Sequence, residues 1–448
     1  MLIAISILLV LCLAILFALA FKHPGVGLAA AWGMLAMEGV LQQSQSFFTS
    51  RTALVNILVA LIATTASYTY IRKTRMPVLS LKLYPPQLLY YATLLAFTFA
   101  SLMWTTDSSF SIIQFQKTLP YILTFAFIAP ICSADTEQLD IAVKTTVLLG
   151  GLILLGTILG QFGARGLLIS QSNGRTAETN PLAIANYAGT VALCCLFSMY
   201  SKSDDRKLLL LHGAIAVLSA VVIFRSGSRG QLIAVFTTAA IFLPIAARKA
   251  SGKAGTGALT FIAAIGLASY FLVHNSAFMS RWHVRGMQVA QRERMNMAGD
   301  ALQIYTDGNI FELLAGIGTS SSWLIFGIYP HNVPVEILLE EGIIGLAIFA
   351  AVAILPLIQF RRILRLPTLP PRVRSQMCLL AALLTFNGIL MLKQGTFLGS
   401  SPFFCISACV GWVYMDIQRR TASASLSPRN SRTHPRHSMH IEPAHQGR

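Results

Sequence analysis

Arginines beside apolar segments are the residues of this sequence best suited to chemistry. Arg225 and Arg229 flank the turn Ser226-Gly227-Ser228, and Arg229 begins an apolar run. A guanidinium group binds phosphate or carboxylate through two parallel hydrogen bonds and stays charged beside a low-dielectric surface. A row of such groups next to a membrane would suit a lipid-linked diphosphate. Further candidates are Arg165, Arg175, Arg281, Arg285, Arg292 and Arg294.

Pairing with acids is the alternative role for the arginines of the polar segment 274–332. We expect it for about half of them, because surface ion pairs form readily where opposite charges are close. Arg229 has no acid nearby in the sequence, and an ionisable residue at the start of a membrane helix is a functional candidate. The acids of the segment are Glu293, Asp300, Asp307 and Glu312.

One histidine stands out by its position. His331 lies in Tyr329-Pro330-His331-Asn332, directly before a long apolar run, and Glu336 follows in the first turns of that run. A neutral imidazole can accept a proton near neutral pH. His331 is therefore a candidate general base.

Metal and nucleotide chemistry have no support in the sequence. No Asp-x-Asp or His/Cys cluster occurs in the polar segments predicted to face outward, and no Walker A motif is present. The seven cysteines lie in or beside apolar runs without C-x-x-C spacing, which is typical of small buried residues rather than of ligands. We expect no metal and no cofactor.

The elements that must position these residues are transmembrane helices. The 448-residue chain is 55% hydrophobic and 11% charged, whereas soluble domains carry about 25% charged residues. Apolar runs long enough to span a bilayer recur along it. Glu38 interrupts the second run, so the sequence predicts 12 or 13 spans. The runs are 2–21, 25–41, 54–71, 87–104, 112–131, 141–161, 182–200, 208–224, 230–247, 256–273, 333–357, 376–394 and 399–416.

The positive-inside rule gives the orientation. The spans place four basic loops and the basic tail on one side, which we take as cytoplasmic; this explains the net charge of +17 without nucleic-acid binding. The acidic loop 132–140 falls on the same side as an exception. Segments 162–181 and 274–332 and the turn after Arg225 are then outside. The four basic loops contain Arg72, Lys73, Arg75 and Lys82; Lys202, Arg206 and Lys207; Arg248, Lys249 and Lys253; and Arg361, Arg362, Arg365, Arg372 and Arg374.

The expected fold is therefore an all-α polytopic bundle with one large periplasmic loop that contains short helices. The predicted divisions are N-terminal helices over 1–174, a core over 175–357 that includes the loop 274–332, C-terminal helices over 358–416, and a disordered basic cytoplasmic tail over 417–448.

Two of the motifs resemble a known family. Ser226-Gly227-Ser228-Arg229-Gly230, which opens an apolar helix, resembles the S-R-G signature of the O-antigen ligase and polymerase superfamily. His331-Asn332, followed by Glu336, Glu341-Gly342 and Gly345, is similar to the H-N…E…E-L-G-x-x-G element of that family.

Weaker similarities lie around these motifs, so that the resemblance covers about residues 175–350. Arg294 with Gly316-Ile317-Gly318 is similar to the family's loop pattern, although the usual Trp after the arginine is missing and Arg292 is an alternative match. Arg175 with Asn180-Pro181-Leu182-Ala183 is similar to an upstream N-P-x-x-A element.

The resemblance implies a metal-independent, multi-pass glycosyltransferase of the bacterial inner membrane whose active site faces the periplasm. The donor would be a glycan on undecaprenyl diphosphate, and the acceptor lipid A-core or another glycan. We expect His331 to act as general base and Arg229 and Arg294 to stabilise the leaving diphosphate. The expected substrate-binding residues are Arg175, Arg225, Arg292, Asn332 and Glu336.

Three alternatives stay open. A polymerase of the same superfamily would use the same chemistry. A polysaccharide or lipid-linked oligosaccharide transporter would have paired charges near the membrane midplane and repeated halves; the sequence offers Glu38, Lys117 and Lys393 as such charges and shows no repeat. A structural assembly protein would leave the outward arginines unexplained.

Overall fold

The computed structural model describes most of the chain. The described residues are 2–44, 46–51, 53–75, 84–159, 169–172, 175–178, 181–201, 206–247, 266, 284–367 and 369–426. The expected span 256–273, apart from residue 266, lies outside them. So do the start of the expected outer loop, 274–283, and the tail beyond residue 426.

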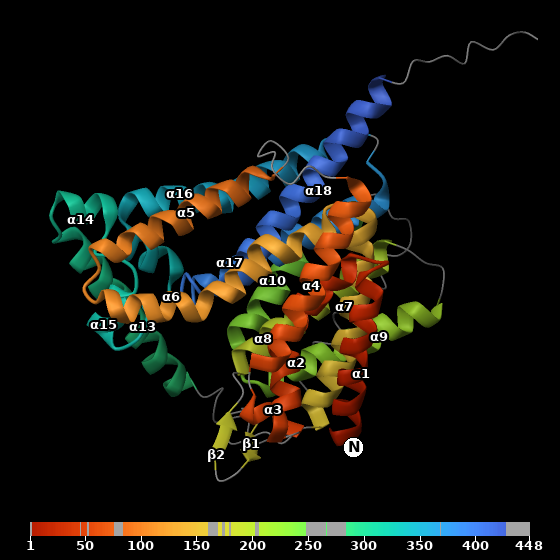
Figure 1. Cartoon of the computed structure of the whole chain (residues 1–448), viewed down its shortest axis with the longest axis horizontal. Coiled ribbons are helices and arrows are strands. Elements are labelled where there is room, and N and C mark those ends of the chain that lie inside the picture. The colour runs from red at the N-terminus through yellow and green to blue at the C-terminus, as the bar shows by residue number, and fades with distance from the viewer. Residues whose placement is uncertain are drawn as a thin grey trace, which may run out of the picture.

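The described chain is helical apart from one short hairpin (Figure 1). The first half contains α1 (Leu2–Ala20), α2 (Gly25–Ser44), α3 (Ser46–Ser50), α4 (Ala53–Thr74), α5 (Pro86–Ala100), η2 (Ser101–Met103), α6 (Ser108–Ile122), η3 (Leu123–Ile128), η4 (Ala129–Ser133), α7 (Thr136–Leu159), β1 (Ile169–Ser172), β2 (Arg175–Glu178) and α8 (Pro181–Ser201). The second half contains α9 (Arg206–Arg225), α10 (Arg229–Ala247), α13 (Val284–Thr306), α14 (Ile310–Ala315), α15 (Ser321–Phe326), α16 (Val333–Leu364), α17 (Pro371–Met391) and α18 (Ser401–Leu426).

The prediction of a multi-pass membrane protein is confirmed. Among the described residues, nine helices have the length and apolarity to cross a bilayer. Helix α2 is not among these nine, and protein covers most of its surface. Residues such as Leu28, Met37 and Leu41 of α2 are fully buried. A helix shielded from lipid in this way can carry Glu38, whose carboxylate accepts a hydrogen bond from Gln42 at 2.8 Å.

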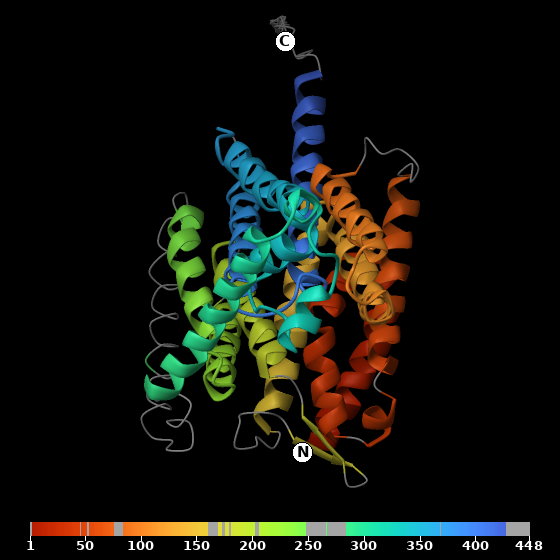
Figure 2. The same cartoon turned by 90° about the vertical axis from the view of Figure 1, so that its left-hand side faces the viewer.

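The described basic segments gather at one end of the bundle, which we call the basic end; they are residues 20–25, 72–75, 361–376 and 416–426, and the segments 133–140 and 197–201 lie with them. Two hydrogen bonds between distant segments show this. Lys73 Nζ donates to Lys22 O at 2.8 Å, and Ser375 Oγ donates to Phe197 O at 2.8 Å. Helix α18 ends here, whereas α1 begins at the opposite end (Figure 2).

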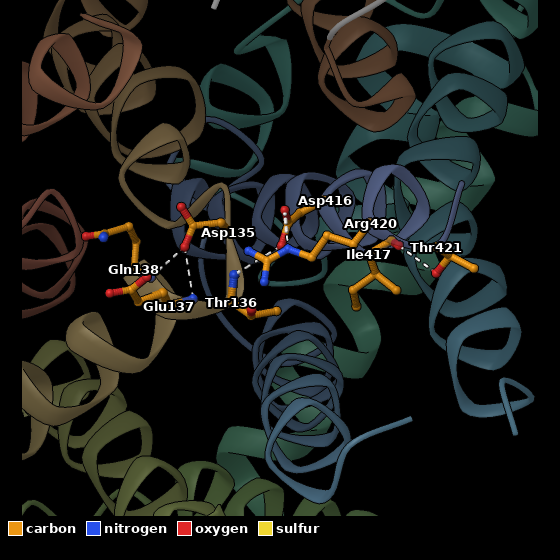
Figure 3. A network of polar contacts seen from close by, with 8 residues as sticks. All are labelled: Asp135, Thr136, Glu137, Gln138, Asp416, Ile417, Arg420 and Thr421. Carbon is orange, nitrogen blue, oxygen red and sulfur yellow. Dashed lines mark hydrogen bonds and ion pairs between the residues drawn. The ribbon is translucent and has the colours of Figure 1, made fainter. Parts of the chain in front are cut away.

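The acidic segment before α7 belongs to the same end and accounts for the exception in the charge pattern. Asp140 forms ion pairs with Lys144 at 2.6 Å and with Arg372 at 2.7 Å. Asp135 accepts from the backbone N–H of Glu137 and Gln138 in the first turn of α7 (Figure 3). These acids lie among cations because they pair with them and cap a helix.

The part of the molecule away from the basic end, which we call the loop end, contains residues 44–53, 100–108, 158–159, 225–230, 306–333 and 391–401; it is not a single face, because α3 and α14 lie far apart in Figure 1. Helices α5 and α16 run side by side and lean away from the main bundle, and α13, α14 and α15 lie around their far ends (Figure 1). The described parts of the segments expected to face outward lie in two places: the hairpin β1–β2 contacts α2 and α3, whereas α13–α15 lie around the far ends of α5 and α16 (Figure 1).

Three details differ from the expected all-α architecture. Strands β1 and β2 form an antiparallel hairpin in which Ser172 pairs with Arg175. Helix α13 has 23 residues, so the expected loop does not contain only short helices. The third is the tail, expected to be disordered from 417 onward; instead, α18 continues to Leu426.

The extension of α18 has local causes. Arg420 Nε bonds Asp416 at 2.9 Å, four residues earlier on the same face, and Asp416 also accepts from the backbone N–H of Thr136 at 3.4 Å (Figure 3). Thr421 Oγ1 donates to Ile417 O at 2.9 Å. Pairs at this spacing stabilise an exposed helix end that apolarity alone does not predict.

Candidate functional site

The turn between α9 and α10 is built by glycine and serine. Gly227 has φ +67°, a conformation that glycine adopts at little cost. The Ser226 hydroxyl donates to Ile223 O at 2.7 Å and accepts from Ser228 N at 3.3 Å. These bonds satisfy polar groups where α9 ends at Arg225, and they fix where Arg229 begins α10.

Gly230 makes room for a second cation next to Arg229. A Cβ at Gly230 would overlap the Lys393 ammonium group, so only glycine allows Lys393 to lie against the first turn of α10. The next residue, Gln231, donates from Nε2 to Gln394 Oε1 at 3.1 Å. The S-R-G turn is thus packed against the segment 392–400, which follows α17.

The His-Asn motif starts α16. His331 has φ +57°, a left-handed conformation that histidine and asparagine tolerate better than most residues. Asn332 caps the helix, because its Oδ1 accepts from Val335 N at 3.3 Å. The Tyr329 ring lies edge-on to the His331 imidazole, with 4.5 Å between ring centroids. The left-handed backbone of His331, the Asn332 cap and the Tyr329 ring therefore fix the place of His331.

Glu336 links the start of α16 to the same segment 392–400. Its side chain is 4% exposed, and Oε2 accepts from the backbone N–H of Phe397 at 3.1 Å. The expected role of Glu336 was substrate binding, whereas the structure gives it a structural bond. Both the helix that follows the S-R-G turn and the helix that follows the His-Asn motif are therefore bonded to this segment, although about a hundred residues separate the two motifs in the sequence.

A cavity of about 330 Å³, which we call the central cavity, opens beside this segment. Tyr329, Gln394 and the first turns of α8, at Leu182 and Ala183, contribute to its wall. The N-P-x-x-A-like element therefore lies at the cavity. Amide and hydroxyl groups dominate its polar surface, and no described lining residue is charged.

Two asparagines line the central cavity from neighbouring helices. Asn387 of α17 donates to Leu383 O in its own helix at 2.8 Å. The Oδ1 of Asn186, on α8, is buried and has no hydrogen-bond partner among the described residues. A buried acceptor without a donor is costly, so this oxygen is suited to a ligand that brings a hydroxyl group.

The other arginines predicted to belong to the site are not shown to lie at segment 392–400 or at the central cavity. Arg225 donates from Nη1 to Ile158 O at 3.3 Å, which attaches α9 to the end of α7. Arg292 is exposed on α13 and does not line the central cavity. Arg175 is the first residue of β2, and Arg294 lies on α13; the side chains of both are outside the description.

The Gly316-Ile317-Gly318 turn is structural. Gly342 has φ +64° and interrupts α16, which frees the carbonyls of Leu339 and Glu340 from their helix. The N–H groups of Ile317 and Gly318 bond these two carbonyls at 3.0 and 2.9 Å. The backbones touch, so a Cβ at Gly316 would overlap Glu340 and one at Gly342 would overlap Leu314.

Two further carboxyl groups of α16 are buried in a hydroxyl-rich layer. Glu340 accepts from Ser320 N at 2.8 Å, and from Ser322 through both N, at 3.1 Å, and Oγ, at 2.5 Å. Glu341 accepts from Ser101 Oγ at 3.2 Å. Sequence reasoning noted these acids only as part of a motif; their signal was two adjacent carboxyl groups inside an apolar run.

Lys393, Gln394, Asn186 and Asn387 are the site residues that sequence reasoning did not assign. Lys393 was considered as a charge near the membrane midplane, but it lies just beyond the end of α17, at the loop end. A lysine directly after an apolar span was the sequence feature that could have marked Lys393 as a site residue. Lys117, the other cation considered, is exposed on α6.

No group of three histidine, cysteine or carboxylate side chains with metal-binding geometry is found within the described ranges. Neither the models of known protein families nor the curated proteins contain a match to this chain.

Proposed function

We propose that the protein is a metal-independent membrane glycosyltransferase of the O-antigen ligase type. It moves a glycan from undecaprenyl diphosphate to a hydroxyl of lipid A-core or of a growing polysaccharide, at the periplasmic face of the bacterial inner membrane. One observation carries the proposal: segment 392–400 joins the turn at Arg229 to the His331 motif, beside a largely apolar cavity whose polar groups are amides and hydroxyls.

The groups around this segment divide the chemistry between them. Arg229 lies in the first turn of α10, and Lys393 lies against that turn. Together they supply the positive charge that a diphosphate requires. The central cavity offers amides, hydroxyls and the Tyr329 ring, which suit a neutral sugar. The unpaired Asn186 oxygen supports this assignment, because a sugar hydroxyl would complete its hydrogen bonding.

The reaction proposed is a direct displacement. The acceptor hydroxyl attacks the anomeric carbon and its proton passes to His331. The bond from that carbon to the diphosphate oxygen breaks, and the lipid diphosphate leaves with the bonding electrons. Arg229 stabilises the charge that develops on it. Displacement at one centre inverts the anomeric configuration.

Substitutions at the two motifs test the proposal. We expect His331→Ala to lower glycan transfer by at least about 10²-fold, the usual contribution of a general base. Arg229→Lys retains the charge but loses the planar fork, and the loss of a bond to a charged group, ~1.5–3 kcal/mol, corresponds to at least about tenfold. Transfer is measured in a deletion strain complemented with each variant, with membrane levels checked by immunoblot.

Arg51→Lys is the matched control for the arginine. Arg51 lies at the same end of the bundle, and its guanidinium group stacks over the Phe47 ring, 4.5 Å from the centroid. We expect this variant to transfer glycan at the wild-type rate. Wild-type transfer by His331→Ala would show that another group takes the proton, and the outward carboxylates would then be the next candidates.

A further inference from the structure

A second crevice, of about 160 Å³, lies at the basic end between α7, α8 and α9, far from the segment 392–400. Its polar wall contains Asp140, Lys144 and His212, and its apolar wall includes Leu148 and Leu211. None of these residues takes part in the proposed glycosyl transfer, so the crevice needs its own explanation.

Cations exceed acids around this crevice once Arg372 is counted, which does not line it but pairs with the lining residue Asp140. A single oxygen, Oδ2 of Asp140, receives both Lys144 Nζ and Arg372 Nη2. One negative charge therefore faces two positive charges, and one positive charge is left over. The Nε of Arg372 is buried and has no hydrogen-bond partner among the described residues. The Lys144 and Arg372 side chains are 49% and 37% exposed, so a ligand can reach both.

The rim of the crevice is apolar and exposed. Leu148 is 61% exposed on α7, and Leu211 is 42% exposed on α9, next to Leu210 at 73%. Both helices are long and apolar enough to span a bilayer, so leucines exposed on them face acyl chains. A water-soluble anion would gain nothing from these side chains, whereas a lipid would cover them.

We propose that this crevice binds an anionic phospholipid, with its phosphate at Lys144 and Arg372 and an acyl chain along Leu148 and Leu211. Basic pockets between membrane helices near the cytoplasmic surface are suited to such headgroups. The crevice lies where the basic segments gather, which is the side expected to face the anionic inner leaflet. His212, 5% exposed, forms the floor behind the headgroup. This site is independent of the proposed function.

Lipid binding by the purified full-length chain tests the proposal. In a mild non-ionic detergent, phosphatidylglycerol and phosphatidylcholine with identical acyl chains are titrated, and bound lipid is followed by native mass spectrometry. Each basic residue near an anionic headgroup contributes about 1 kcal/mol, so we expect at least about fivefold tighter binding of phosphatidylglycerol. Lys144→Gln should weaken that binding about fivefold, because Asp140 keeps its pair with Arg372 while the excess positive charge is lost.

Lys117→Gln provides the matched control, since it removes the same charge from an exposed site on α6. It should bind phosphatidylglycerol like the wild type. Equal affinity for the two lipids, an unchanged affinity in Lys144→Gln, or displacement of the lipid by excess inorganic phosphate would each overturn the proposal. If Lys144→Gln does not fold, Leu148→Glu replaces an exposed side chain at the rim, and unaltered phosphatidylglycerol binding by that variant would also overturn it.

Discussion

Glu340 shows how one buried side chain can replace local capping. The short helix α15 begins at Ser321 after Ser320, whose own side chain makes no capping bond. The Glu340 carboxyl group, from α16, instead accepts from the N–H groups of Ser320 and Ser322 and from the Ser322 hydroxyl. The acid thereby satisfies donors that a helix start leaves free, and it holds the segment that leads to Tyr329 and His331.

We predict that Glu340→Gln destabilises the protein by about 1–3 kcal/mol, the cost of leaving a buried hydrogen-bonding group unsatisfied. One glutamine oxygen can still accept from Ser322, but the amide NH₂ then faces the N–H of Ser320, and two donors meet. Thermal unfolding in detergent measures the change.

Glu312→Gln is the control for this substitution. Glu312 belongs to an exposed capping box, in which Oε2 accepts from Asn309 N at 2.8 Å. Water can replace that bond, so we expect a smaller loss of stability. Equal stability of Glu340→Gln and the wild type would show that the Glu340 bonds contribute little.

Helix α16 is the element on which most of the site depends. It begins at the Asn332 cap, carries Glu336, Glu340 and Glu341, and is interrupted at Gly342. The interruption exposes two backbone carbonyls to the Gly316–Gly318 turn. The motif glycines at 316, 318 and 342 thus share one physical cause, which is backbone packed directly on backbone.

We predict that Gly342→Ala is strongly destabilising. Its Cβ would overlap the Leu314 carbonyl, which cannot move without breaking the bonds of Ile317 and Gly318 to α16. Gly327→Ala is the control, because Gly327 has φ +69° but open space around it. It therefore measures the cost of a positive φ without the overlap of a Cβ with neighbouring backbone.

The control should lose about 1–2 kcal/mol and Gly342→Ala clearly more, as measured by unfolding temperature in detergent. Similar losses in the two variants would mean that the contact between the turn and α16 is loose.

The whole molecule separates its charges and its candidate chemistry between two ends. The basic segments and their acidic partners, such as Asp140 and Asp416, lie at one end. The Arg229 turn and the His331 motif are joined through segment 392–400, and α13–α15 lie away from the basic end (Figure 1). Helix α1 begins at the loop end and α18 ends at the basic end, so the first and last helices of the described chain have their outer ends on opposite sides of the bundle (Figure 2).

We predict that residues 274–332 face the periplasm and that the tail faces the cytoplasm, since positively charged segments are retained inside. Reporter fusions at Ser280 and Ser427 measure the two sides, and a fusion before Leu2 should report the same side as Ser280. Finding Ser280 and Ser427 on one side of the membrane would contradict the arrangement.

The sequence by itself determined the helices, their order and the end at which most segments lie. Apolar runs, basic loops and cap residues such as Asn332 act over a few neighbouring residues, so their effects can be predicted without a fold. The same local signals marked the turn at Arg229 and the motif at His331. They failed at α18, where the ion pair between Asp416 and Arg420 stabilises the continued helix, and at the β1–β2 hairpin.

Only the tertiary structure decided which of these local features meet. Lys393 lies against Gly230, Phe397 bonds Glu336, and Asp140 pairs with Arg372, each across a long stretch of sequence. Such pairs depend on how helices pack, and close packing is set by the shapes of many side chains together rather than by any one segment. For that reason the charge pattern could predict a common end for Arg229 and His331, while the segment that joins them had to be seen in the fold.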